Sequence, residues 1–131
     1  MTTMVPLTDD LSVTGQIEPA DLTVIAEAGY KTIISNRPDG EGEKQPRNAE
    51  LAKQAQQLGI TFIEQPVQSA AITPEDYDNF ADILRTATTP VLAFCRTGTR
   101  CSRLWVEASD DLESREARRN KAVELGFSIP D

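Results

Sequence analysis

The chain passes from an apolar strand into a short loop and then into a helix over Pro90-Val91-Leu92-Ala93-Phe94-Cys95-Arg96-Thr97-Gly98-Thr99-Arg100-Cys101-Ser102. The strand delivers Cys95 to a loop that carries two arginines. A cysteine reacts as its thiolate, and cations, inward-pointing backbone amides and a helix N-terminus all lower the thiol pKa. The stretch therefore predicts a thiolate nucleophile in an anion-binding loop. The alternative is a buried structural cysteine that ends a core strand before an ordinary glycine turn.

The loop residues divide into a nucleophile and a set of oxyanion ligands. We expect Cys95 to be the nucleophile, with Arg100 and Arg96 binding phosphate, sulfate or carboxylate, because guanidinium groups bind these anions through two parallel hydrogen bonds. Gly98 permits a left-handed backbone. The predicted oxyanion-binding residues are Arg96, Thr97, Gly98, Thr99, Arg100 and Cys101.

Strand-like and helix-like segments alternate along the rest of the chain. Strands are expected at 11–17, 31–35, 60–63 and 90–94, and helices at 19–28, 48–58, from 73 onward, at 102–108 and at 114–125. This alternation predicts an α/β fold with a mainly parallel sheet of four or five strands flanked by helices. Ligands bind at the carboxyl ends of such strands, so the loops 36–42, 64–71 and 95–100 should converge around Cys95.

Composition narrows the possible functions. The 131 residues, with a net charge of −8, predict a single domain over 1–131 that repels nucleic acid and anionic membranes. Two cysteines and no histidine exclude Ser-His-Asp and Cys-His catalysis, a disulfide scaffold and a typical metal site. No metal or cofactor is expected.

The start of the chain has no signal-peptide pattern, and we expect a cytoplasmic protein. The oligomeric state stays open.

Several segments together resemble a known family. They are 13–17, 35–40, 64–67 and the Cys95–Arg100 loop followed by Leu104-Trp105. The chain is similar, from about residue 11 to 108, to bacterial phosphatase-like domains found fused to beta-lactamase-like hydrolases, which are relatives of the dual-specificity phosphatases. The resemblance implies a cysteine-phosphatase-like fold in which Cys95 attacks phosphorus, loop amides bind the phosphoryl oxygens, and water hydrolyses a cysteinyl-phosphate.

The chain departs from the general cysteine-phosphatase signature around the nucleophile. Phe94 stands where the signature has a histidine, Arg100 comes one position early, and Cys101 occupies the expected arginine position. The region 65–71, where these phosphatases carry a general-acid aspartate, contains no acidic residue.

Asp39 is the best replacement for the missing acid, because its loop should open on the same edge of the sheet. The alternative for Asp39 is turn formation in Pro-Asp-Gly. Glu64 is a poorer candidate acid, and Asp76 is expected only to stabilise a helix N-terminus.

A rhodanese-type sulfurtransferase is the second hypothesis. The loop from Cys95 to Arg100 has the length of a rhodanese-like active loop, and transfer of sulfur through a Cys95 persulfide needs no general acid. Cys101 could then resolve the persulfide or form a disulfide, although it could equally be a packed helix residue. A third possibility is a module that binds anions without turning them over. In each case the partner is a phosphate- or sulfur-bearing anion.

Overall fold

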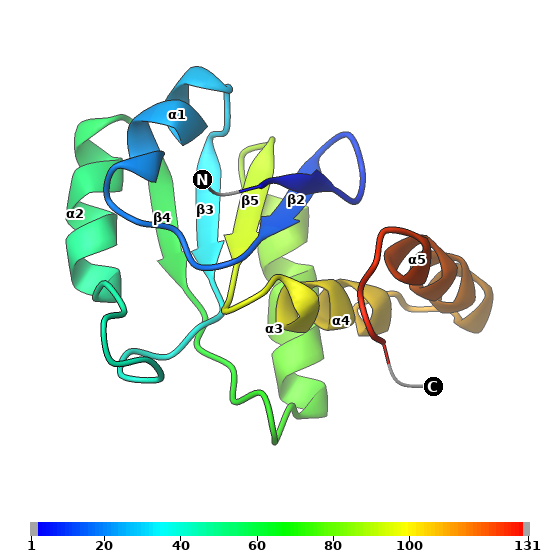
Figure 1. Cartoon of the computed structure of the whole chain (residues 1–131). Coiled ribbons are helices and arrows are strands. Elements are labelled where there is room, and N and C mark those ends of the chain that lie inside the picture. The colour runs from blue at the N-terminus through cyan, green and yellow to red at the C-terminus, as the bar shows by residue number, and fades with distance from the viewer. Residues whose placement is uncertain (1–2, 130–131) are drawn as a thin grey trace.

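A computed structural model describes residues 3–129 of the chain and contains one five-stranded sheet (Figure 1). Its strands are β1 (Val5–Pro6), β2 (Leu11–Thr14), β3 (Thr32–Ser35), β4 (Thr61–Glu64) and β5 (Val91–Phe94), in the order β1-β2-β5-β3-β4. The strands β2, β5, β3 and β4 are parallel, and β1 pairs with β2 in the antiparallel direction. The expected mainly parallel α/β sheet is confirmed.

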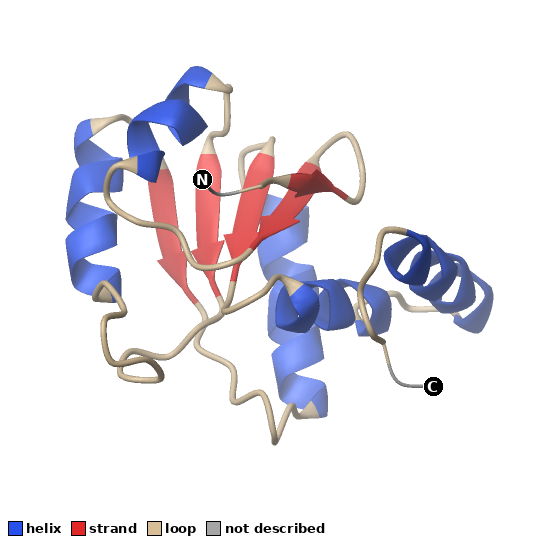
Figure 2. Ribbon diagram, in the orientation of Figure 1, coloured by secondary structure: helices blue, strands red, loops and turns tan. Residues whose placement is uncertain are grey.

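Helices cover both faces of this sheet (Figure 2). The helices α1 (Asp21–Glu27) and α2 (Asn48–Gln57) lie over one face, and α3 (Pro74–Thr86) and α4 (Thr99–Glu107) lie over the other, with α5 (Leu112–Glu124) packed on α4. Neighbouring strand residues point to opposite faces. Ile33 therefore packs in the core beside α1 and α2, whereas Ile34 packs in the core beside α3 and α4.

The three largest differences from the sequence prediction concern β2, α4 and β1. The strand predicted over 11–17 ends at Thr14. The next residue, Gly15, passes the loop so closely that an added Cβ would lie 3.0 Å from the Arg96 carbonyl oxygen. The helix predicted from Ser102 already begins at Thr99, directly after the left-handed Gly98. The short strand β1 was not expected from the sequence.

The predicted start of α3 is confirmed. The Thr73 hydroxyl accepts a hydrogen bond from the Asp76 backbone N–H at 3.2 Å, and the Asp76 carboxylate accepts one from the Thr73 backbone N–H at 2.9 Å. This reciprocal capping box stabilises the helix N-terminus. Asp76 thus has the structural role expected of it.

The sheet register brings the ends of three strands together. Ser35, the last residue of β3, pairs with Phe94 of β5 on one side and with Glu64 of β4 on the other. The residues that follow these strands therefore leave the same edge of the sheet. Cys95 is the residue after Phe94, so it begins its loop at this shared edge. Within residues 3–129, no helix is long and apolar enough to cross a membrane.

Candidate active site

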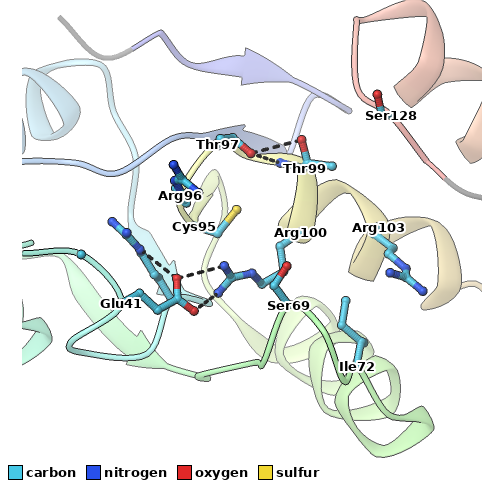
Figure 3. Close-up of a pocket in the computed structure, with 12 residues that line it drawn as sticks. Glu41, Ser69, Ile72, Cys95, Arg96, Thr97, Thr99, Arg100, Arg103 and Ser128 are labelled. Carbon is cyan, nitrogen blue, oxygen red and sulfur yellow. Dashed lines mark hydrogen bonds and ion pairs between the residues drawn. The ribbon is translucent and has the colours of Figure 1, made fainter.

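Cys95 lines a cavity of about 750 Å³ at the carboxyl edge of the sheet (Figure 3). Its side chain is only 1% exposed, and its Sγ accepts a hydrogen bond from the Gly98 backbone N–H at 3.1 Å. Gly98 has a φ of 89°, in the left-handed region, and an added Cβ would lie 3.2 Å from a ring carbon of Phe127. Glycine is therefore needed at position 98 for both conformation and space.

Hydrogen-bond donors surround the Cys95 sulfur and favour its ionised form. The Cys101 thiol donates a hydrogen bond to this sulfur and makes the largest contribution to lowering the pKa of Cys95. The backbone N–H groups of Cys101, Thr97 and Gly98 lower this pKa further. Burial opposes ionisation, but the donors outweigh it and lower the pKa of Cys95 to about 6. A pKa of about 6 favours the thiolate of Cys95 at neutral pH, and its role as the nucleophile stays a prediction.

Cys101 has the opposite character. It lies in the first turn of α4 and is fully buried in the apolar core beside α3 and α4. Burial, together with the negative charge of the neighbouring Cys95 sulfur, raises the pKa of Cys101 well above its usual value. Cys101 thus keeps its proton and can donate it in a hydrogen bond to Cys95. Both cysteines are free thiols.

Arg100 ties together the three loops that were expected to converge. Its Nη1 donates to the carbonyl oxygens of Asn36 at 3.1 Å and Val67 at 3.0 Å. The same guanidinium makes a two-pronged ion pair with Glu41, with distances of 3.1 Å from Nη1 to Oε2 and 3.0 Å from Nη2 to Oε1. Arg100 is 8% exposed and lines the cavity, so its contacts hold the cavity walls in place. Its role as an oxyanion ligand stays a prediction.

Glu41 joins Arg100 to Arg37, a residue of the converging loop 36–42 to which the sequence analysis assigned no role of its own. Its Oε1 also accepts a hydrogen bond from Nε of Arg37 at 3.0 Å, and Nη1 of Arg37 donates to Gln16 at 3.0 Å. Burial by itself raises the pKa of Glu41, but the hydrogen bonds from Arg100 and Arg37 outweigh it and leave this pKa below its usual value. Glu41 is thus ionised at neutral pH. Opposite charges at positions 37 and 41, in a loop at the carboxyl edge, were the only sequence signal for this pair.

The rest of the predicted loop surrounds the same cavity. Arg96, Thr97 and Thr99 line it, and the Thr97 and Thr99 hydroxyl oxygens lie 3.2 Å apart. Arg96 has an exposed side chain, and its carbonyl oxygen accepts a hydrogen bond from the Gln16 backbone N–H at 3.3 Å. The structure therefore brings every predicted oxyanion-binding residue to the cavity wall or to the Cys95 sulfur.

Asp39 and Glu64 do not belong to the cavity lining. The Asp39 carboxylate accepts a hydrogen bond from the Asn48 backbone N–H at 2.8 Å, at the beginning of α2. Glu64 ends β4 as an exposed residue. Among the described residues that line the cavity, Glu41 is the single carboxylate. The part of the chain between residues 3 and 129 also contains no cluster of three His, Cys, Asp or Glu residues able to hold a metal ion.

Sequence comparison relates the chain to one family. The family model described as "Beta-lactamase hydrolase-like protein, phosphatase-like domain" matches residues 3–110. A curated beta-lactamase hydrolase-like protein from Agrobacterium fabrum (strain C58 / ATCC 33970) is 35% identical over 127 residues, which are 95% of this chain and 30% of the relative. The chain thus spans less than a third of the length of this relative.

Solved structures share the fold. A Neisseria meningitidis Z2491 structure described as that of a candidate phosphatase is 39% identical, with a TM-score of 0.77 over 91% of this chain and 87% of that one. A kinase-associated phosphatase, with its catalytic-site cysteine replaced by serine, has a TM-score of 0.78 at 16% identity, over 100% of this chain and 87% of that one. The architecture is therefore that of the cysteine phosphatases.

Proposed function

The chain belongs to the phosphatase-like domains of the beta-lactamase hydrolase-like proteins, and on this premise we propose that it hydrolyses phosphoesters through a cysteinyl-phosphate on Cys95. One observation carries the proposal: a buried sulfur with a pKa of about 6 faces a cavity lined by four arginines, Arg37, Arg96, Arg100 and Arg103. A thiolate supplies the nucleophile, and Arg96 and Arg100 together with the loop amides supply the binding site for the phosphoryl oxygens.

The reaction has two displacements at phosphorus. The Cys95 thiolate attacks phosphorus, so that a P–S bond forms while the bond from phosphorus to the leaving oxygen breaks. Water then attacks the same phosphorus, and the thiolate leaves as inorganic phosphate forms. The amides of Thr97, Gly98 and Cys101, which face the sulfur in the structure, stabilise Cys95 both before attack and as the second leaving group.

The charge state of the cavity restricts the leaving group. Glu41 is the single carboxylate that lines the described cavity, and its ion pairs with Arg37 and Arg100 keep it ionised. An ionised carboxylate cannot donate a proton to a departing alkoxide. Loss of general-acid catalysis costs roughly 10²–10⁴-fold. We therefore expect the enzyme to prefer substrates that leave without a proton, such as aryl phosphates with acidic phenols.

Aryl phosphates with phenols of graded acidity test this function directly. We expect turnover to fall steeply as the phenol becomes less acidic, and rapid-quench mass spectrometry should detect phosphate on Cys95. Cys95→Ser should abolish both signals, whereas Cys101→Ser, the matched control, should keep the phosphoenzyme. Absence of turnover and of a phosphoenzyme for every aryl phosphate would overturn the phosphatase proposal.

A sulfurtransferase is the second candidate, and the same lack of a proton donor favours it. The Cys95 thiolate would attack the outer sulfur of thiosulfate, breaking the S–S bond, releasing sulfite and leaving a Cys95 persulfide. A thiolate or cyanide would then accept the outer sulfur and restore the Cys95 thiolate. Neither displacement needs a general acid. Thiocyanate formation from thiosulfate and cyanide, without aryl phosphate turnover, would select this reaction, and turnover of neither substrate would leave an anion-binding module.

A further inference from the structure

We propose that the cavity accepts a small organic substrate with two anionic groups, the reacting group at Cys95 and a second one bound by Arg103. This inference rests on the proposed function, because it assumes that the loop at Cys95 binds an anion. It adds a specificity-determining residue that does not contact the reacting atoms. The claim therefore concerns the substrate class rather than the reaction.

The size of the cavity supports a substrate larger than inorganic phosphate. Its volume of about 750 Å³ falls within the range of roughly 300–1,000 Å³ that is typical of pockets for small organic ligands. The lining includes the half-buried Ile72 and the rim serines Ser69 and Ser128 as well as the Cys95 loop. An apolar surface next to polar groups fits an organic body that carries charges.

Charge pairing divides the four arginines of the cavity into two groups. Arg37 and Arg100 share Glu41 as their ion-pair partner. Within residues 3–129, neither Arg96 nor Arg103 has a carboxylate within ion-pair distance, although the chain carries a net charge of −8. Arg103 is half-buried. A partly desolvated guanidinium without an internal partner gains most from an anionic ligand.

The position of Arg103 suits it to bind the second anionic group of the substrate rather than the group that reacts at Cys95. Arg103 follows Arg100 by three residues on α4, so both lie on the same side of the helix, with Arg103 about 4.5 Å further along its axis. Figure 3 shows Glu41 and Arg96 on one side of Cys95, and Arg103 beside Ile72 on the other. An anion at Cys95 and another at Arg103 would therefore bracket an organic body lying against Ile72.

Protection of Cys95 against alkylation by iodoacetamide tests the inference with two matched probes. Phenylphosphonate has one anionic group that cannot be hydrolysed, and (4-carboxyphenyl)phosphonate adds a carboxylate to the same ring. The dissociation constant of each probe is obtained from the slowing of Cys95 alkylation, with peptide mapping to identify the modified cysteine. The proteins compared are wild type, Arg103→Gln, Arg103→Lys and Arg85→Gln. The last is the control, because Arg85 is exposed on α3 outside the cavity and its loss changes the net charge equally.

We expect wild type to bind (4-carboxyphenyl)phosphonate at least tenfold more tightly than phenylphosphonate, because one charge-assisted contact contributes roughly this factor. Arg103→Gln should lose this preference and still bind phenylphosphonate as tightly as wild type does. Arg103→Lys should keep part of the preference for the carboxylated probe, and Arg85→Gln should keep all of it. Equal binding of both probes to wild type, or an equal loss of both in Arg103→Gln, overturns this inference alone. Failure of both probes to protect Cys95 overturns the proposed function as well.

Discussion

Cys95 begins the loop before α4 and Cys101 lies in the first turn of α4; the two are almost equally buried and yet differ in chemistry. Cys95 is 1% exposed and Cys101 is 0% exposed. The Cys95 sulfur accepts hydrogen bonds from backbone amides and from the Cys101 thiol, which lowers its pKa to about 6. Cys101 is surrounded by apolar side chains and the negative Cys95 sulfur, which raise its pKa. The direction of the surrounding donors, rather than exposure, determines which of the two sulfurs ionises more easily.

Serine substitution at each cysteine should produce the largest contrast between them. Cys95→Ser removes the thiolate and should lower kcat/KM for an aryl phosphate by roughly 10³-fold or more, as loss of a nucleophile does. Cys101→Ser keeps a hydrogen-bond donor beside Cys95 and should stay within about tenfold of wild type. Steady-state kinetics on both variants measures the contrast. Equal losses at the two positions would remove the distinction between nucleophile and donor.

Glu41→Gln should have the next largest effect, because it removes the anion shared by Arg100 and Arg37. The Glu41 side chain is 25% exposed, so solvent screens part of the loss, and we expect the free energy of unfolding to fall by about 1–2 kcal/mol. Weaker anchoring of Arg100 should also lower kcat/KM by roughly tenfold. Urea denaturation and steady-state kinetics measure the two effects, with the neighbouring exposed residue Glu43→Gln as control.

The stability difference between Glu41→Gln and wild type should depend on pH. Because folding lowers the pKa of Glu41, its contribution to stability is fully present above the usual glutamate pKa and is lost as the pH falls through the folded-state pKa. The two proteins should therefore differ in stability at pH 7 and converge in acid. A constant difference down to pH 3 would show that the ion pairs do not contribute.

Cys101→Ala should change the reactivity of Cys95 more modestly. Alanine removes the thiol that donates to the Cys95 sulfur and leaves the backbone amides, so the pKa of Cys95 should rise towards that of an ordinary thiol. Alkylation of Cys95 at pH 6 should slow by roughly two- to tenfold, because the net free energy of one hydrogen bond corresponds to a factor of this size. Cys101→Ser should restore the wild-type rate. Equal slowing in both variants would point to altered packing instead of a lost donor.

Asp39→Asn should have the smallest effect on catalysis. The Asp39 carboxylate accepts a hydrogen bond from the first residue of α2, and Asp39 is not part of the cavity lining. We expect kcat/KM to change by less than about threefold, since asparagine can also accept this hydrogen bond. A loss of roughly 10²–10⁴-fold, with loss of the basic limb of the pH profile, would instead identify Asp39 as the general acid that the sequence suggested.

Local sequence signals were sufficient to predict the elements that carry Cys95. The apolar run before it, the glycine within its loop and the helix after it are all short-range patterns, as is the capping box at Thr73. The convergence of three loops followed from the parallel order of strands alone. These features depend on residues close in sequence or on a general rule of sheet topology.

Long-range contacts could not be predicted in this way. Arg100 and Glu41 are separated by 59 positions, and no local pattern indicates that the arginine expected to bind substrate also binds a loop carboxylate. The close approach of Gly15 to the Arg96 carbonyl, directly after β2, likewise joins residues that are distant in sequence. The donor relationship between Cys101 and Cys95 requires the helix to begin at Thr99, earlier than helical patterning alone indicated.

The pH dependence of Cys95 alkylation tests the central claim most directly, because it measures ionisation without assuming a substrate. Iodoacetamide rates from pH 4.5 to 9.5, assigned to each cysteine by peptide mapping, should give a midpoint near pH 6 for Cys95 and no modification of Cys101. A Cys95 midpoint at the usual thiol value of about 8.5, or faster modification of Cys101, would contradict the account.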